Sequence, residues 1–244
     1  MESIKIVSLE QALALIAEID PRDLIFWIGA GIDRRAPTCL PLGDDLRSEF
    51  LKFSIGNTLS ELIDDEWKRT YEQLAILLSK RVWLSESQRL ETIIDCIQEF
   101  EDNLLVKDSS VIKGLSCFED VEPNHNHFVL AHYLLKGASV VTTNYENCMQ
   151  KAYARITKNH QALSISYEDP ASSVYVFCDK CYSSGEVHYI HGIASEPKKI
   201  GISLSSIKKG LGEEFPKWFN EWVREGKTIV YLGYSGSDSQ TLLH

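Results

Sequence analysis

The sequence predicts an α/β fold with a mainly parallel sheet and helices on both faces. Uncharged apolar runs such as "LIFWI" and "TIVYL" are typical of buried strands. Segments with helical spacing of apolar residues separate these runs, and this alternation indicates a parallel sheet. Each run also ends in a small or polar loop, and such loops form the ligand crevice of a parallel sheet.

The first forty residues predict a helix and then a buried strand. "SLEQALALIAEID" is amphipathic; Ser8 and Gln11 fit a capping box at its start, and Pro21 ends it. The strand runs from Leu24 to Ile28 and enters the turn "GAG". "PLGDDLRSEFLKF" follows as a helix with these residues at helical spacing: Leu42, Leu46, Phe50 and Phe53.

Residues 54–120 are charged and helical in pattern, with few strand signals. We interpret them as a helical insertion or subdomain within one domain that spans residues 1–244. We also expect the chain to be part of a longer protein. Two apolar stripes support the insertion: Leu74, Leu77, Leu78 and Val82, then Leu90, Ile93, Ile94 and Ile97.

The second half alternates again. "PNHNHFVLAHYLLKG" predicts a helix with Pro123 near its start and Gly137 at its end, and the strand "VVTTNYEN" follows. Residues 161–205 contain four short strand-like runs: "LSISY", "VYVFC", "EVHYIHG" and "KIGISLS". "EEFPKWFNEWVREG" is a helix ended by Gly226, and "TIVYLGYSGSD" is a last strand that enters a Gly/Ser loop.

Composition argues against several classes of protein. The chain is 44% hydrophobic and has a net charge of −10, which argues against direct nucleic-acid binding by this domain. It contains no run of about 18 apolar residues, and "MESIKIVSLE" is not a signal peptide. Six cysteines without a secretory signal indicate reduced thiols, so we expect a cytoplasmic protein without a membrane span.

Four predicted strands end in polar or glycine-rich loops. These loops contain Gly29-Ala30-Gly31, Thr142–Tyr145, His191-Gly192 and Gly233–Asp238. The carboxyl ends of parallel strands meet at one edge of the sheet. The sequence therefore predicts that the four loops form one ligand site.

Together these motifs, with Pro41-Leu42-Gly43 and the helix start "PNHNH", resemble the sirtuin-like NAD-binding domains. The resemblance spans residues 24–238 and implies a Rossmann-like fold. Sirtuin deacetylases carry two CxxC pairs after the HG motif, whereas this chain has only "CDKC", before His191. The loop "GYSGSD" and the strand "TTNY" look more like the sirtuin-like NAD hydrolases of bacterial antiviral defence.

That resemblance implies that NAD is the substrate and that Asn144 and His191 are catalytic. Asn144 would hold the ribose or orient water, and His191 would act as a base near neutral pH. The N–H groups of Gly29 and Gly31 would face the diphosphate. The further NAD contacts implied are Ala30, Asp33, Thr143, Tyr145, Gly192, Gly233, Ser235 and Asp238. As partners we expect further copies of the chain or a defence-system protein.

Asp33 departs from the family pattern, which usually has Ser or Thr soon after GAG. A carboxylate there would repel a diphosphate, so we expect Asp33 to cap the following turn or to pair with Arg34 or Arg35. Asn144 has a plainer alternative as a turn former or a cap of the next helix.

Other polar residues have plainer interpretations. The spacing of Cys178, Cys181, His188 and His191 is shorter than zinc fingers use, so we expect no metal. Alternation along the strand places His188 on the opposite face from Val187 and Tyr189, so we expect it to pack or to face solvent and not to act as a second base. For the histidines of the "PNHNH" helix we expect a solvated surface: His125, His127 and His132.

Two other functions remain open. One is a non-catalytic sensor of NAD or ADP-ribose-type nucleotides, and the other is an NAD-dependent protein deacylase.

Overall fold

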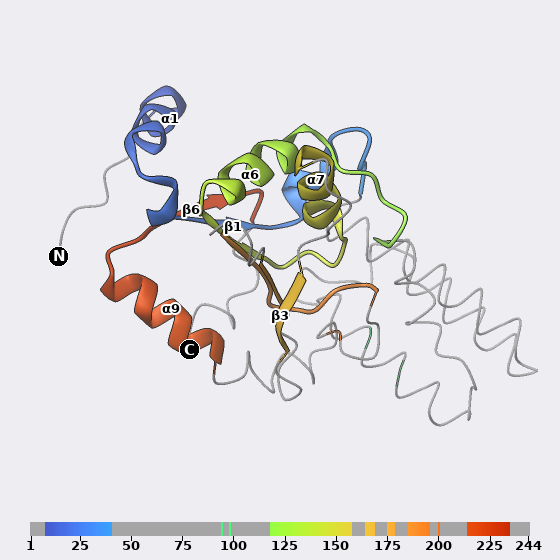
Figure 1. The fold of residues 1–244 in the computed structure, drawn as a ribbon. Coiled ribbons are helices and arrows are strands. Elements are labelled where there is room, and N and C mark those ends of the chain that lie inside the picture. Colours follow the sequence, from blue (N-terminus) through green and yellow to red (C-terminus); the bar gives the residue numbers. More distant parts are fainter. Residues whose placement is uncertain are drawn as a thin grey trace, which may run out of the picture.

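A computed structural model describes residues 8–40, 94, 98, 118–157, 164–168, 175–178, 185–195, 200 and 214–234. Figure 1 shows these parts as ribbons. The predicted helix at 41–53, nearly all of the predicted insertion at 54–120, and all but residue 200 of the strand-like run at 199–205 lie outside the described residues. So do Cys181, Ser235 and Asp238.

The core of the fold is a six-stranded sheet with the order β3-β4-β5-β2-β1-β6. The four neighbours β5, β2, β1 and β6 run parallel, which confirms the predicted mainly parallel sheet. The strands are β1 Leu24–Ile28, β2 Ser139–Thr142, β3 Ser164–Glu168, β4 Tyr175–Cys178, β5 Glu186–Tyr189 and β6 Thr228–Leu232. β4 and β3 extend one edge; β4 pairs antiparallel with both β5 and β3, and this reversal of β4 was not predicted.

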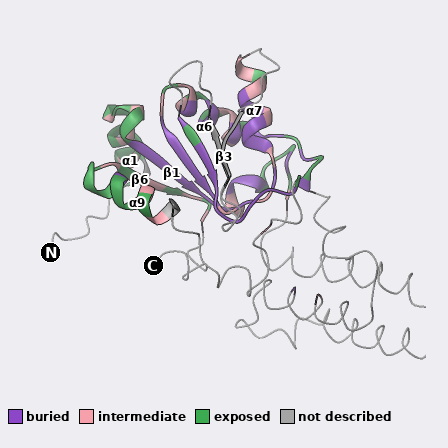
Figure 2. Ribbon diagram, turned by 60° about the horizontal axis from the view of Figure 1, so that its bottom comes forward, coloured by how far each residue is buried: buried purple, intermediate pink, exposed green. Residues whose placement is uncertain are grey.

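Helices cover both faces of the sheet, as predicted (Figure 1). α6 (His125–Leu135) and α7 (Cys148–Thr157) pack on one face, and α9 (Glu214–Arg224) packs on the other. Because side chains alternate along β1, Phe26 points to the α6 side and Trp27 to the α9 side. All five residues of β1 are buried, as Figure 2 shows. A strand covered on both faces needs such an uncharged sequence.

Local signals fix the start of one helix and the end of another. In α1 (Leu9–Glu18), Ser8 and Gln11 form the predicted capping box: the Gln11 N–H donates to Ser8 Oγ over 3.2 Å, and the Ser8 N–H donates to Gln11 Oε1 over 3.0 Å. α6 ends near Gly137, which has φ 100° and satisfies the left-handed turn expected after a helix.

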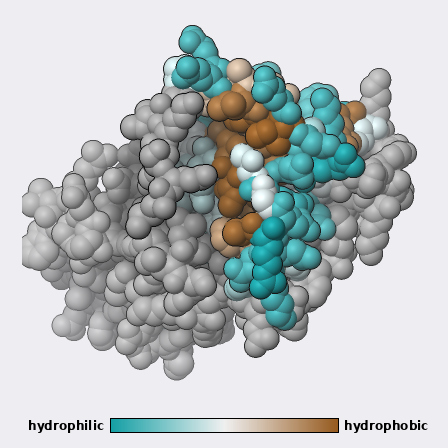
Figure 3. Space-filling model, turned by 90° about the vertical axis from the view of Figure 1, so that its left-hand side faces the viewer, coloured by the Kyte–Doolittle hydropathy of each residue, from teal (hydrophilic) through white to brown (hydrophobic). Residues whose placement is uncertain are grey.

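The face formed near α1, β6 and α9 has a mixed surface. Figure 3 shows apolar side chains gathered there between hydrophilic ones. Large exposed apolar residues of these elements are Leu13, Leu15, Val223 and Tyr231. No helix in the described ranges is long and apolar enough to cross a membrane.

Candidate functional site

The four parallel strands end at the same level. Leu232 pairs with Ile28, Ile28 with Thr142, and Thr142 with Tyr189. The hydrogen bonds continue one residue further, because the Thr143 N–H donates to the Ile28 carbonyl over 3.2 Å and the Ile190 N–H donates to the Thr142 carbonyl over 3.1 Å. The loops after these strands therefore converge at one edge, as predicted. We call this edge the strand-end site.

Asn144 and His191 occupy equivalent places in the strand-end site. Each lies two residues beyond the paired residues Thr142 and Tyr189, on adjacent parallel strands. Both side chains are buried: Asn144 is 6% exposed and His191 is 4% exposed. Gly192 follows with φ 83°, a left-handed conformation that favours glycine and turns the chain immediately after His191.

The glycines of the GAG turn pack against Gly233. A Cβ on Gly29 would lie 2.9 Å from the Gly233 carbonyl oxygen, and one on Gly31 would lie 2.6 Å from Gly233 Cα. The Gly29 N–H donates to the Leu232 carbonyl over 3.1 Å, and the Gly31 N–H donates to the Gly233 carbonyl over 2.9 Å. The expectation that these two N–H groups face a diphosphate is therefore wrong, because both already serve to join two strand ends.

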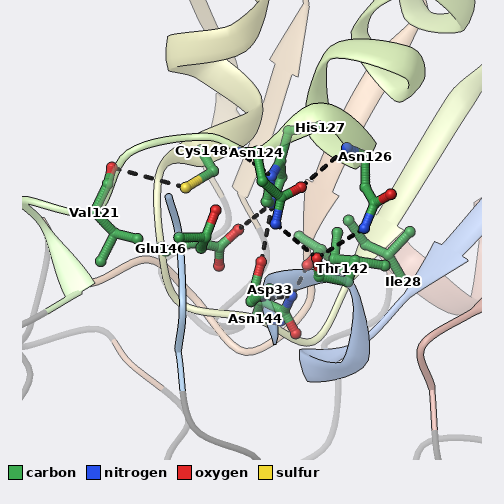
Figure 4. Close-up of polar contacts among 12 residues, drawn as sticks. Ile28, Asp33, Val121, Asn124, Asn126, His127, Thr142, Asn144, Glu146 and Cys148 are labelled. Atoms are coloured by element: carbon green, nitrogen blue, oxygen red, sulfur yellow. Dashed lines mark hydrogen bonds and ion pairs between the residues drawn. The ribbon is translucent and has the colours of Figure 1, made fainter. Parts of the chain in front are cut away.

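A short 3₁₀ helix, η2 (Ala30–Arg34), follows this turn and carries Asp33 inward. Asp33 is 2% exposed. Its Oδ2 accepts a hydrogen bond from Asn144 Nδ2 over 2.9 Å, and its Oδ1 lies 2.9 Å from His127 Nε2 (Figure 4). The predicted pairing of Asp33 with Arg34 or Arg35 is wrong, because both carboxylate oxygens face buried partners from other segments.

His127 connects this carboxylate to the start of α6. Asn124 is the N-cap, and its backbone N–H donates to His127 Nδ1 over 3.1 Å. Asn124 Nδ2 also donates to the Ile32 carbonyl over 2.9 Å, which ties α6 to η2. His127 is fully buried, so the prediction that it lies on a solvated helix surface is wrong.

The capping bond decides the tautomer of His127. Because Nδ1 accepts a hydrogen bond from the Asn124 N–H, the ring proton must be on Nε2, facing Asp33. Burial lowers the pKa of His127, whereas the neighbouring carboxylates of Asp33 and Glu146 raise it, with a balance at about 9. A charged ring would place a second proton against the Asn124 N–H. The intact cap therefore favours the neutral Nε2–H form over the charged form that the raised pKa favours.

Glu146 completes a buried acidic cluster. One carboxylate oxygen lies 3.7 Å from His127 Nε2, and neither oxygen has a hydrogen-bond partner within the described part of the chain. Burial, together with the charge of Asp33, raises the pKa of Glu146 from 4.5 to about 7. Burial likewise raises the pKa of Asp33. Glu146 therefore retains a proton at pH values where an exposed carboxylate would release it.

Cys148 lies beside the same cluster. His127 Nε2, a Glu146 oxygen and Cys148 Sγ lie within 4.8 Å of one another, a spacing that suits a metal ion. However, Nε2 carries the ring proton, and burial raises the pKa of the Cys148 thiol, whose Sγ lies 3.8 Å from the Val121 carbonyl oxygen. A protonated imidazole nitrogen and a neutral thiol are poor metal ligands. The hydrogen bonds therefore favour a site that holds protons.

The remaining predicted residues flank this cluster. Thr143 Oγ1 lies 3.5 Å from the Ile28 carbonyl oxygen, and the Tyr145 ring is 5.9 Å from the Phe118 ring. The Ala194 N–H donates to the Tyr145 carbonyl over 2.8 Å, which joins the loop after β2 to the loop after His191. Ala30 lies in η2.

His188 has the packing role expected of it. Its ring contacts Trp218 and Trp222 of α9, with centroid distances of 4.9 and 5.1 Å. Its Nε2 lies 3.1 Å from Glu186 Oε2. His188 thus faces α9. The Cys178 side chain and Cys181, which share the motif with His188 and His191 for which we expected no metal, lie outside the described residues.

The sequence reasoning missed two residues of the cluster. His127 occupies the third position of the helix that starts after Asn124, where a capping box places its second partner. Considering cap positions instead of helix faces would have directed it inward. Glu146 lies two positions after the predicted site residue Asn144, and that spacing was the available signal.

Residues 138–243 match a family model described as a SIR2-like domain. The match covers β2 to β6, with Asn144, His191 and Gly233, and it supports a sirtuin-like domain. The GAG turn, Asp33 and His127 precede the matched residues. No curated protein matches the chain.

Proposed function

We propose that this chain, which contains a sirtuin-like domain, is an NAD hydrolase that releases nicotinamide and leaves ADP-ribose. The observation that carries the proposal is the placement of Asn144 and His191 at equivalent ends of two adjacent parallel strands. One pocket at that edge can present an amide and an imidazole to the same ribose. From the resemblance to the defence hydrolases we also propose that the enzyme is an effector of bacterial antiviral defence. Self-assembly or a partner protein would activate it.

The reaction breaks the bond between C1′ of the ribose and the nicotinamide nitrogen. Nicotinamide leaves as a neutral molecule, so no strong general acid is needed. The ribose passes through an oxocarbenium-like transition state, as in sugar hydrolysis. Water then forms the new bond to C1′ and loses one proton.

The side chains divide these tasks. The carbonyl oxygen of the Asn144 amide accepts a hydrogen bond from a ribose hydroxyl or from the attacking water. This bond holds the hydroxyl or the water in the position that the reaction needs. His191 takes the proton that the water or a ribose hydroxyl loses. Asp33 lies behind Asn144, and its negative charge favours the positive charge that develops on the ribose. A carboxylate in this place assists the reaction without touching the diphosphate.

The test follows nicotinamide release from NAD by the purified protein, alone and in its assembled state. Asn144→Ala and His191→Ala are compared with Glu122→Gln, which changes a half-exposed carboxylate paired with Arg155. We expect release by the wild type and by Glu122→Gln, and a loss of at least about a hundredfold in the two site variants. Absence of release from the assembled wild type, or full activity in both site variants, contradicts the proposal.

A nucleotide sensor is the second candidate, and one observation favours it. The Gly29 and Gly31 N–H groups bond to carbonyls within the protein, so the turn offers fewer donors to a diphosphate than a phosphate-binding loop would. Weak binding without chemistry suits such a turn. Calorimetry with NAD and ADP-ribose, showing binding without nicotinamide release in the assembled protein, would select the sensor.

A further inference from the structure

We infer that Asp33 is a positioning residue for Asn144: it holds the amide nitrogen and so turns the amide oxygen toward the substrate. This inference rests on the proposed function, in which that oxygen accepts a proton from a ribose hydroxyl or water. The resemblance does not supply it, because related domains usually have Ser or Thr soon after GAG. Asp33 also lies outside the residues matched by the family model.

Polar contacts that can be made in only one way fix the orientation of the Asn144 amide. The Asn124 N–H can only donate, so His127 Nδ1 accepts and Nε2 carries the proton. That nitrogen lies 2.9 Å from Asp33 Oδ1, so the carboxylate oxygen and the protonated nitrogen attract each other. A backbone group at the start of α6 thus determines which atoms Asp33 must present.

Asp33 passes this direction on to Asn144. An ionised carboxylate only accepts, so its Oδ2 must bind the NH₂ end of the Asn144 amide, which lies 2.9 Å away. Figure 4 shows the amide nitrogen on the Asp33 side and the amide oxygen turned away from it. Without this partner the two ends of an amide have nearly the same shape, and either could face the substrate.

Burial makes the partner irreplaceable by water. Asp33 is 2% exposed, Asn144 is 6% exposed and His127 is fully buried. The backbone of Asn144 is held as well, because its N–H donates to Thr142 Oγ1 over 3.0 Å. The remaining freedom of this side chain is the amide orientation, and Asp33 removes it.

An amide at position 33 would reverse the arrangement. In Asp33→Asn, the one side-chain oxygen must accept the His127 Nε2 proton, because the cap prevents a change of tautomer. The new NH₂ then faces Asn144 Nδ2, and two donors cannot bond. Asn144 must flip, which presents its NH₂ to the substrate in place of its oxygen.

An exchange of the two side chains should restore the arrangement. In the double variant Asp33→Asn with Asn144→Asp, the new NH₂ at position 33 donates to a carboxylate at position 144. The second oxygen of that carboxylate then faces the substrate as an acceptor. Asn144→Asp alone instead places two buried carboxylates against each other.

The experiment measures kcat and KM for nicotinamide release, with melting temperatures, for the wild type, Asp33→Asn, Asn144→Asp and the exchanged pair. Glu122→Gln, on an exposed carboxylate, is the control and keeps wild-type values. We expect kcat to fall at least tenfold in each single variant, KM of Asp33→Asn to change less than threefold, and the exchanged pair to recover at least tenfold over Asp33→Asn. The melting temperature should show the same loss and recovery.

Two results overturn the inference. One is a kcat of Asp33→Asn within twofold of the wild type. The other is an exchanged pair whose kcat loss equals the product of the single losses. If the assembled wild type releases no nicotinamide, the proposed function fails instead. The melting temperatures then decide the relation between Asp33 and Asn144 by themselves: recovery in the exchanged pair supports it, and additive losses overturn it.

Discussion

Asn144 Nδ2 donates a hydrogen bond to Asp33 Oδ2 over 2.9 Å, although 111 positions of sequence separate the two residues. β1 and β2 are neighbours in the sheet, so the loops that follow them meet. This contact turns two separate motifs, the GAG turn and the TTNY strand end, into one constellation. His127 joins it from a third segment, at the start of α6.

Replacing His127 should destabilise the fold strongly. His127→Ala removes the His127 half of the α6 capping box and leaves Oδ1 of the buried Asp33 carboxylate without its neighbouring ring N–H. We expect the free energy of unfolding in urea to fall by about 3 kcal/mol or more. His125→Ala is the matched control, because His125 is exposed on the same helix, and its change should stay within about 0.5 kcal/mol. Equal losses in the two variants would contradict the buried role of His127.

Stability should fall as the pH rises through neutrality. The pKa of Glu146 is raised from 4.5 to about 7, so the native state binds this proton more tightly than the unfolded chain does. The stabilisation is complete below pH 4.5 and is lost as the pH rises through 7. The pKa of Asp33 is also raised by burial, which gives the same sign.

Glu146→Gln tests this pH dependence, because glutamine stays neutral at every pH. Relative to the wild type, the variant should gain on the order of 3 kcal/mol in free energy of unfolding between pH 5 and pH 8. Any constant cost of the new NH₂ group cancels in this comparison. Urea unfolding of both proteins at the two pH values measures it. If the difference in unfolding free energy between the two proteins is the same at both pH values, Glu146 does not bind the proton responsible for the pH dependence.

Gly233 should tolerate no side chain. It has φ 62°, and an added Cβ would lie 2.6 Å from the Ile32 backbone nitrogen. Gly226 has a similar φ of 72° but nothing within 4 Å of an added Cβ. Gly226→Ala should therefore cost about 1 kcal/mol, the penalty of the left-handed backbone alone. Gly233→Ala should cost several times more and reduce nicotinamide release, as unfolding and activity assays would show. Equal losses of unfolding free energy in the two variants would mean that the GAG turn shifts to make room for the new Cβ.

The two cysteines with described side chains should differ in reactivity. Cys39 is exposed, whereas Cys148 is buried and its pKa is raised by that burial. In the native protein, Cys39→Ser should remove one fast-reacting thiol from a titration with a disulfide reagent. Cys148→Ser should leave the number of fast thiols unchanged. Loss of a fast thiol in Cys148→Ser would show that the cluster around Glu146 is open to solvent.

Local patterns in the sequence predicted much of the fold. The uncharged run Leu24–Ile28 matches β1 at both ends, and Ser8 with Gln11 forms the predicted cap. Such features depend on neighbouring residues only. The antiparallel pairing of β4 with β5 and β3 was not predicted, because a short strand-like run carries no signal for the direction in which it pairs.

The site was predicted less completely, for a physical reason. Asn144 and His191 were found at strand ends, and parallel pairing brings those ends together. The partners of Asp33 were not found, because a contact across 111 positions leaves no local pattern. The Gly29 and Gly31 N–H groups were assigned to a ligand, but they donate to the carbonyls of Leu232 and Gly233 at a neighbouring strand end.

We propose that this domain hydrolyses NAD and that Asn144 is required for the reaction. The most direct measurement is the rate of nicotinamide release from NAD by the assembled wild type and by Asn144→Ala, both shown to be folded by their melting curves. We expect steady nicotinamide release by the wild type and a rate at least about a hundredfold lower for Asn144→Ala. Equal rates, or NAD left intact by the wild type, would contradict it.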